Sequence, residues 1–101
     1  MKPDKVLAML GLAMRAGKVV SGEFSTEKAV KSGKACLVIV AEDASDNTKK
    51  KFSDSCSYYQ VPYAVYGTKE SLGHSIGKEM RASLAVIDEG FGRELAKKME
   101  L

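Results

Sequence analysis

The spacing of hydrophobic residues predicts a helix, a short strand and a second helix at the start of the chain. Apolar residues recur along one helical stripe at Val6, Leu7, Leu10, Ala13 and Met14. Pro3 suits the first turn of this helix, and Gly17 is typical of a helix end. We then expect a short strand in residues 18–21 and a second helix from about Glu23 to Ser32.

The run Ala35–Ala41 is apolar at successive positions rather than at alternate ones. A strand of this kind has to be covered on both faces, as in the centre of a layered α/β fold. A third helix follows, which Ser45 or Asp46 can cap and which Pro62 ends. Its apolar stripe leaves Lys49–Lys51 in water. The buried line of this helix is predicted to be Thr48, Phe52, Ser55, Cys56 and Tyr59.

The rest of the chain continues the alternation of helix and strand. Residues 63–67 and 83–88 read as strands, and Thr68 can cap a short helix between them that runs to about Ser75. A last helix carries Phe91, Leu95 and Met99 on one side. This order predicts a single domain, residues 1–101, that folds as a three-layer α/β/α sandwich.

The second helix has two faces of different chemistry. The face expected to pack on the sheet consists of Thr26, Ala29, Val30 and Gly33. Phe24, Lys28 and Lys31 fall on the opposite face, so an aromatic ring and two cations would share a surface in water. Cations suit phosphates and a flat apolar ring suits an unstacked base, while Gly22 would let a backbone approach the helix start. The pattern favours contact with a nucleic acid.

The same residues have a purely structural interpretation. If Ser25 is the N-cap of the helix, Phe24 precedes the cap and can pack on Ala29 as a hydrophobic staple. Lys28 and Lys31 would then be ordinary solvated residues.

A second cluster of the same kind lies in the loop Gly77–Ser83, just before the last predicted strand. Met80 stands there between Lys78 and Arg81, so an adaptable apolar tip is flanked by cations. Met80 could instead fold back into the core. Exposed Phe24 and Met80 would also suit a protein-interaction module on the same scaffold, which is the alternative function.

Charge supports the first part of the chain as the contact region. The sequence has 16 Lys and Arg against 13 Asp and Glu, and a net charge of +3 implies only mild attraction to polyanions. Residues 1–40 alone carry seven basic against three acidic residues. The positive surplus therefore gathers around the second helix.

One stretch resembles a catalytic motif. Gly73–Gly77 reads GHSIG and fits the G-x-S-x-G nucleophile elbow. That elbow needs a strand before it and a helix after it, whereas a short helix is expected before Ser75 and a strand after it. His74 is the only histidine and, as the adjacent residue, cannot turn back as its base. We therefore expect no catalysis.

The remaining candidates for chemistry are weak. Cys36 and Cys56 lack the spacing of metal ligands and are expected to be small buried core residues in a reducing compartment. We expect no metal, no other cofactor and no small-molecule substrate. The first residues imitate a signal peptide, but Asp4 and Arg15 argue against one, and no apolar run is long enough to span a membrane. The expected location is the cytoplasm.

Several blocks, in this order, resemble the kink-turn RNA-binding family of ribosomal proteins seven-Ae and thirty-e, in particular its small bacterial members. The blocks are AGKVVSG, KAVKSGKACLVIVAEDAS, YYQVPY, LGHSIGK and AVIDEGF, and with the first helix they cover nearly the whole chain. The resemblance implies an α/β/α sandwich with a four-stranded mixed sheet and no catalysis. It also implies structured RNA as the partner, with ribosomal RNA and ribosomal proteins among the candidates.

The resemblance also implies site residues. RNA would lie between the start of the second helix and the loop before the last strand. Gly22, Ser25 and Lys28 match the family's RNA-reading motif, and Phe24 stands where that motif has Asn or Lys to read tandem sheared G·A pairs. In the loop, the matching positions are Gly77, Lys78 and Arg81, and Met80 stands where an aromatic residue often stacks on a flipped-out base.

Overall fold

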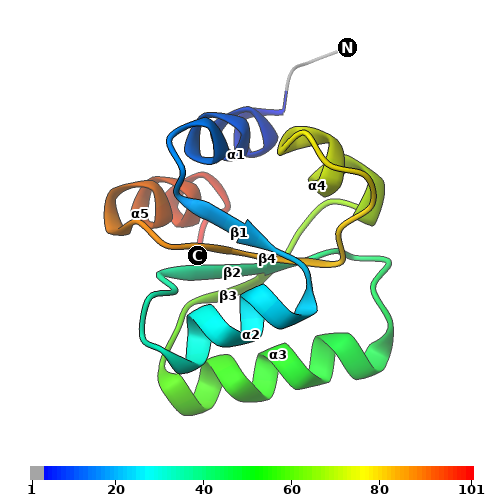
Figure 1. The fold of residues 1–101 in the computed structure, drawn as a ribbon, viewed down its shortest axis with the longest axis vertical. Helices are drawn as coiled ribbons and strands as arrows, with labels where there is room; N and C mark the ends of the chain where they lie inside the picture. The colour runs from blue at the N-terminus through cyan, green and yellow to red at the C-terminus, as the bar shows by residue number, and fades with distance from the viewer. Residues whose placement is uncertain (1–3) are drawn as a thin grey trace.

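The computed structural model describes residues 4–101, so the expected role of Pro3 lies outside the described residues. Helices and strands alternate as the sequence pattern predicts, beginning and ending with a helix (Figure 1). The elements are α1 (Lys5–Arg15), β1 (Val19–Ser21), α2 (Glu23–Lys31), β2 (Leu37–Val40), α3 (Asp46–Tyr59), β3 (Tyr63–Val65), α4 (Lys69–Ser75), β4 (Ser83–Val86) and α5 (Glu89–Lys98).

The four strands form one mixed sheet in the order β1-β4-β2-β3. β4 pairs antiparallel with both β1 and β2, and β2 pairs parallel with β3. β4 is the last strand in the sequence but lies between the first two. As a result, the loop that leads into β4 reaches the same end of the sheet as the connection from β1 to α2 (Figure 1).

Helices cover both faces of this sheet. Figure 1 shows α1, α4 and α5 on one side and α2 with α3 on the other. The three-layer α/β/α sandwich with a four-stranded mixed sheet is therefore confirmed. Strand β2 explains the arrangement, because all four of its residues, Leu37–Val40, are buried and so need cover on both faces.

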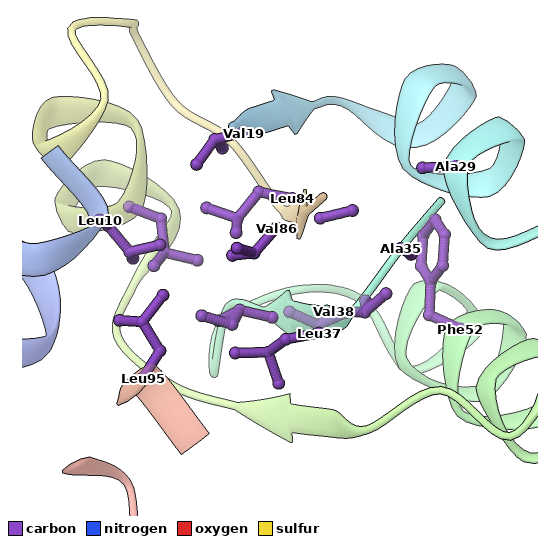
Figure 2. Packing of buried hydrophobic residues seen from close by; sticks show 14 of the residues in the cluster. Leu10, Val19, Ala29, Ala35, Leu37, Val38, Phe52, Leu84, Val86 and Leu95 are labelled. Carbon is purple, nitrogen blue, oxygen red and sulfur yellow. The ribbon is translucent and has the colours of Figure 1, made fainter. Parts of the chain in front are cut away.

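The core lies on both sides of the sheet. Leu10 of α1 and Leu95 of α5 point towards the sheet from one side, and Ala29 of α2 and Phe52 of α3 from the other (Figure 2). Leu10, Leu95 and Phe52 are fully buried. The core fixes α2 and α3 as one layer, and their outer surface carries the candidate site.

Several details differ from the sequence predictions, among them Thr48 and Ser55 of the predicted buried line of α3, which are only half-buried. The central strand is shorter than Ala35–Ala41, although both of these end residues are buried. Cys36 is only half-buried, and Gly33, which follows α2 with φ 78°, is exposed rather than packed on the sheet. Tyr59 is 42% exposed, because it ends α3 and its ring stands edge-on to the ring of Tyr58. Periodicity identifies which residues form the apolar stripe of a helix. It does not show how far the neighbouring elements extend to cover that stripe.

The structure also decides which residue starts α3. Ser45 is the N-cap, and its hydroxyl accepts a hydrogen bond from the backbone N–H of Thr48. Asp46 is the first helical residue. No helix within residues 4–101 has the length and apolar character that crossing a membrane requires.

Candidate nucleic-acid interface

Helix α2 starts without a side-chain cap. The N-cap residues of α1, α3, α4 and α5 are Asp4, Ser45, Thr68 and Asp88, and each accepts a backbone N–H of its own helix. The N-cap of α2 is Gly22, which has no side chain to do so. The first-turn N–H groups of α2 therefore remain available to an outside acceptor, which is favoured there by the helix dipole.

The position of Gly22 is set by the sheet. Ser21 pairs with Leu84 at the end of β1, and the N–H of Gly22 donates to the carbonyl of Ser83 at 3.0 Å. Gly22 has φ 91° and ψ 160°, a conformation that is essentially confined to glycine. The strand-to-helix turn therefore requires glycine and places the start of α2 beside β4.

Phe24 lies in the first turn of α2 and is 79% exposed. This contradicts the staple interpretation: Ser25 lies inside the helix rather than at its cap, and a ring so exposed is not packed on Ala29. Lys28 follows one turn later and is also exposed. Phe24 and Lys28 line two shallow hollows, one towards Glu27 and Ser32 and one towards β1. The aromatic ring and Lys28 thus share a surface in water.

Lys31 is exposed on the same helix, but its charge is already paired. Its ammonium lies 2.7 Å from Glu27, and Lys51 of α3 lies 2.6 Å from Glu27 and 3.0 Å from Glu23. Hydrogen bonds from Lys31 and Lys51 lower the pKa of Glu27 to about 2. The bond to Glu27 raises the pKa of both lysines.

The Lys51 side chain is still 38% exposed, but its ammonium is bonded to two carboxylates of the neighbouring helix. Lys28 differs from it. None of the ion pairs within residues 4–101 includes Lys28. On the exposed face of α2, Lys28 is therefore the lysine that forms no ion pair with a carboxylate of residues 4–101.

The loop between α4 and β4 is held against α4. The N–H of Lys78 donates to the carbonyl of Gly73 at 2.8 Å, and the N–H of Arg81 donates to the carbonyl of Lys69 at 3.0 Å. A methyl group at Gly73 would lie 1.4 Å from the carbonyl oxygen of Glu79. Only glycine at this position lets the loop pass so close to the helix. Sequence reasoning assigned Gly73 to a helix end and missed this contact.

Two loop side chains face different surroundings. Met80 is 57% exposed, which rules out the interpretation that it folds back into the core. Arg81 is half-buried; its Nε donates to Ser21 Oγ at 3.1 Å and its Nη1 to the carbonyl of Met80 at 3.0 Å. Ser21 immediately precedes Gly22. Arg81 therefore joins the loop to the turn from which α2 starts.

The candidate site residues lie on two segments that the bond from Arg81 to Ser21 connects. Gly22, Phe24, Ser25 and Lys28 belong to the start of α2, whereas Gly77, Lys78, Met80 and Arg81 belong to the loop between α4 and β4. Lys31 lines the same hollow as Phe24 and Lys28, as predicted, but its charge is paired with Glu27. Sequence reasoning missed Ser21, because no sequence signal connects it to Arg81, 60 residues away.

The other candidates for chemistry have no comparable surroundings. Ser75 is the last residue of α4, and its hydroxyl donates to the carbonyl of Leu72 at 2.7 Å, so a helix precedes the residue where a nucleophile elbow needs a strand. His74 is exposed. Within residues 4–101, no three side chains of His, Cys, Asp or Glu are grouped as a metal site would need.

A small α/β/α domain with an uncapped helix start, a glycine turn and a loop braced beside it has the features of a binding surface, but a fold by itself does not fix function. The family model described as Ribosomal protein L7Ae/L30e/S12e/Gadd45 matches residues 4–96. The chain belongs to this family.

Relatives and solved structures agree with this assignment. A Bacillus subtilis protein named "RNA-binding protein YlxQ" is 52% identical over 86% of this chain and 87% of its own length. A protein of the same name from Enterococcus faecium is 41% identical over 96% of this chain and 93% of its own.

Among solved structures, a Bacillus halodurans protein of unknown function is 43% identical and superposes with a TM-score of 0.94 over 98% of this chain and all of its own. The Giardia lamblia 15.5kD RNA binding protein, 23% identical, shares the fold with a TM-score of 0.81 over 99% of this chain and 92% of its own.

Proposed function

We propose that this chain is a non-catalytic RNA-binding protein of the cytoplasm that recognises structured, kink-turn-like RNA and associates with the ribosome. The observation that carries the proposal is the bond from Arg81 to Ser21, which joins the α4–β4 loop to the start of α2. We infer that the exposed side chains of Phe24 and Met80 face the same RNA. Membership of a ribosomal protein family and the names of two relatives as RNA-binding proteins support RNA as the partner.

Each residue has a role that its geometry supports. Phe24 and Met80 are exposed apolar groups that can cover unstacked bases. Lys28 supplies a cation to phosphate. Arg81 has five N–H donors, of which the bonds to Ser21 and to the Met80 carbonyl use two, so its remaining donors can bind phosphate.

The remaining site residues of the helix start and the loop define how closely an RNA backbone can approach. Gly22 lets an RNA strand come close to the helix start, where the N–H groups of the first turn lack a side-chain cap. Ser25, in the same turn, can exchange hydrogen bonds with a base edge or sugar. Gly77, with φ 72°, turns the loop so that Lys78 stands exposed near Met80.

The test measures binding of a kink-turn hairpin RNA with tandem sheared G·A pairs, as a function of salt. Lys28→Ala is expected to weaken binding and to lower the salt slope by about one unit. Lys98→Ala is the matched control, because Lys98 is exposed on α5, in the opposite layer. An unchanged slope for Lys28→Ala would remove Lys28 from the contact surface.

A second RNA separates kink-turn recognition from general binding of structured RNA. In this RNA the sheared G·A pairs are replaced by Watson–Crick pairs. The proposal expects weaker binding to it, because the helix would lose its kink. Equal affinity for both would exclude the kink-turn part of the proposal, and no binding to either would exclude RNA binding. Partners retained from cells after nuclease treatment would instead support a protein-interaction module.

A further inference from the structure

Two carboxylates lie on the same helix as the proposed RNA surface. Glu23 immediately precedes Phe24, and Glu27 lines one of the two hollows that Phe24 and Lys28 share. A phosphate backbone that reached this surface would meet both negative charges. The family assignment does not explain how the chain accommodates them.

Lys51, on the neighbouring helix, accounts for both carboxylates. Helix α3 lies beside α2 in the same layer (Figure 1), and the Lys51 ammonium contacts Glu23 Oε1 at 3.0 Å and Glu27 Oε2 at 2.6 Å. Lys31 contacts the other oxygen of Glu27 at 2.7 Å. Two lysines thus balance two glutamates, and the cluster has no net charge.

The geometry also ties both carboxylates to α3, at the edge of the proposed contact. Glu23 and Glu27 are four residues apart and share the helix face that is turned towards α3, where Lys51 bonds to both. Lys28, one residue further, is not part of the cluster. Without Lys51, the Glu23 side chain would lose the one ion pair it makes within residues 4–101 and could turn towards Phe24.

We propose that Lys51 is a positioning residue for RNA binding: it holds Glu23 and Glu27 on the α3 side of α2 and neutralises them, and it does not itself contact the RNA. This proposal rests on the proposed function and adds a residue outside the contact surface to it. The hydrogen bonds from Lys31 and Lys51 lower the pKa of Glu27 to about 2, which reflects the same pairing of its carboxylate.

Two other roles for Lys51 predict different behaviour. If Lys51 bound phosphate directly, its removal would cost the same affinity whether or not the glutamates are charged. If Lys51 only fastened α3 to α2, replacing the two glutamates would disturb the same contact and would also weaken binding. A positioning role predicts that uncharged partners make Lys51 dispensable.

The experiment measures the affinity for the kink-turn hairpin RNA at low salt for the wild type and Lys51→Met. It adds Glu23→Gln/Glu27→Gln and the triple variant that combines all three changes. Lys50→Met is the control: Lys50 is the adjacent α3 residue and pairs only at 3.6 Å with Asp54, so its loss reports the long-range effect of one removed cation. Circular dichroism confirms that each variant is folded, and Lys51→Gln is a second test of the position.

We expect Lys51→Met to weaken binding by about three- to ten-fold, beyond the effect of Lys50→Met. Glu23→Gln/Glu27→Gln should bind at least as tightly as the wild type. In that background, Lys51→Met should cost no more than Lys50→Met costs in the wild type.

Three results would overturn the assignment of Lys51. The first is that Lys51→Met and Lys50→Met reduce RNA affinity equally in the wild type. The second is that Lys51→Met reduces RNA affinity as much in the Glu23→Gln/Glu27→Gln background as in the wild type. The third is that Glu23→Gln/Glu27→Gln itself binds the RNA more weakly than the wild type. In each of these cases the wild type still binds the RNA, and the proposed function stands. A wild type that does not bind the RNA refutes the proposed function and the role of Lys51 with it.

Discussion

Replacing Phe24 with Ala separates a binding role from a folding role. The ring is 79% exposed, so folding removes only about a fifth of its surface from water. With ~200 Å² for a phenylalanine, this is ~40 Å², or about 1 kcal/mol of hydrophobic stabilisation. Alanine is the better helix former by ~0.5 kcal/mol, which offsets part of that loss. We expect the free energy of unfolding to change by less than about 1 kcal/mol.

The effect on RNA binding should be larger. A base that stacks on an aromatic side chain contributes ~1–3 kcal/mol as measured by alanine substitution. Phe24→Ala should therefore weaken binding to the kink-turn hairpin by about five-fold to more than a hundred-fold, since 1.4 kcal/mol corresponds to about ten-fold. The loss of affinity would exceed the loss of stability.

Two measurements check this prediction, urea unfolding followed by circular dichroism and RNA titration at fixed salt. Tyr58→Ala is the matched control, because Tyr58 is also 79% exposed but lies near the end of α3, outside the proposed surface. We expect Tyr58→Ala to leave RNA affinity unchanged. A Phe24→Ala protein that unfolds much more easily and binds normally would refute the reasoning and restore a folding role for the ring.

Three further predictions concern the supports of the surface. Gly73→Ala should lower the free energy of unfolding by about 2 kcal/mol or more and weaken RNA binding. The new methyl group would lie 1.4 Å from the Glu79 carbonyl oxygen and would displace the loop. Unchanged urea unfolding would contradict this prediction. Gly22→Ala should cost about 1–3 kcal/mol in the same assay, since φ 91° is strained for alanine; a neutral effect would show that the turn adapts. The pKa of Glu27 is lowered from 4.5 to about 2, so its stabilising contribution is complete above about pH 4.5 and is lost as pH falls towards 2. Thermal melting should show Glu27→Gln less stable than the wild type at neutral pH and the difference vanishing near pH 2, whereas a difference independent of pH would exclude the ion pairs as its cause.

The sequence by itself determined the elements and their layers. Residues 37–40 are apolar at every position, so the strand needs cover on both faces, and the alternation of helix and strand supplies that cover. The 3.6-residue period of α2 likewise placed Phe24 and Lys28 on the solvent side, and both are exposed. These predictions hold because burial of a helix or strand depends on its own periodicity.

Only the tertiary structure decided which side chains meet. Arg81 bonds to Ser21 across 60 residues of sequence, and Lys51 to Glu23 across 28, because β4 lies beside β1 and α3 beside α2. The same contacts show that the charge of Lys31 is paired, whereas Lys28 has no ion pair among residues 4–101. The tertiary structure also decided which residue is the N-cap of α2. The pairing of β1 with β4 fixes the turn at Gly22 and leaves Ser25 inside the helix. Periodicity states which way a residue faces, but contact between distant residues depends on the order in which strands and helices pack.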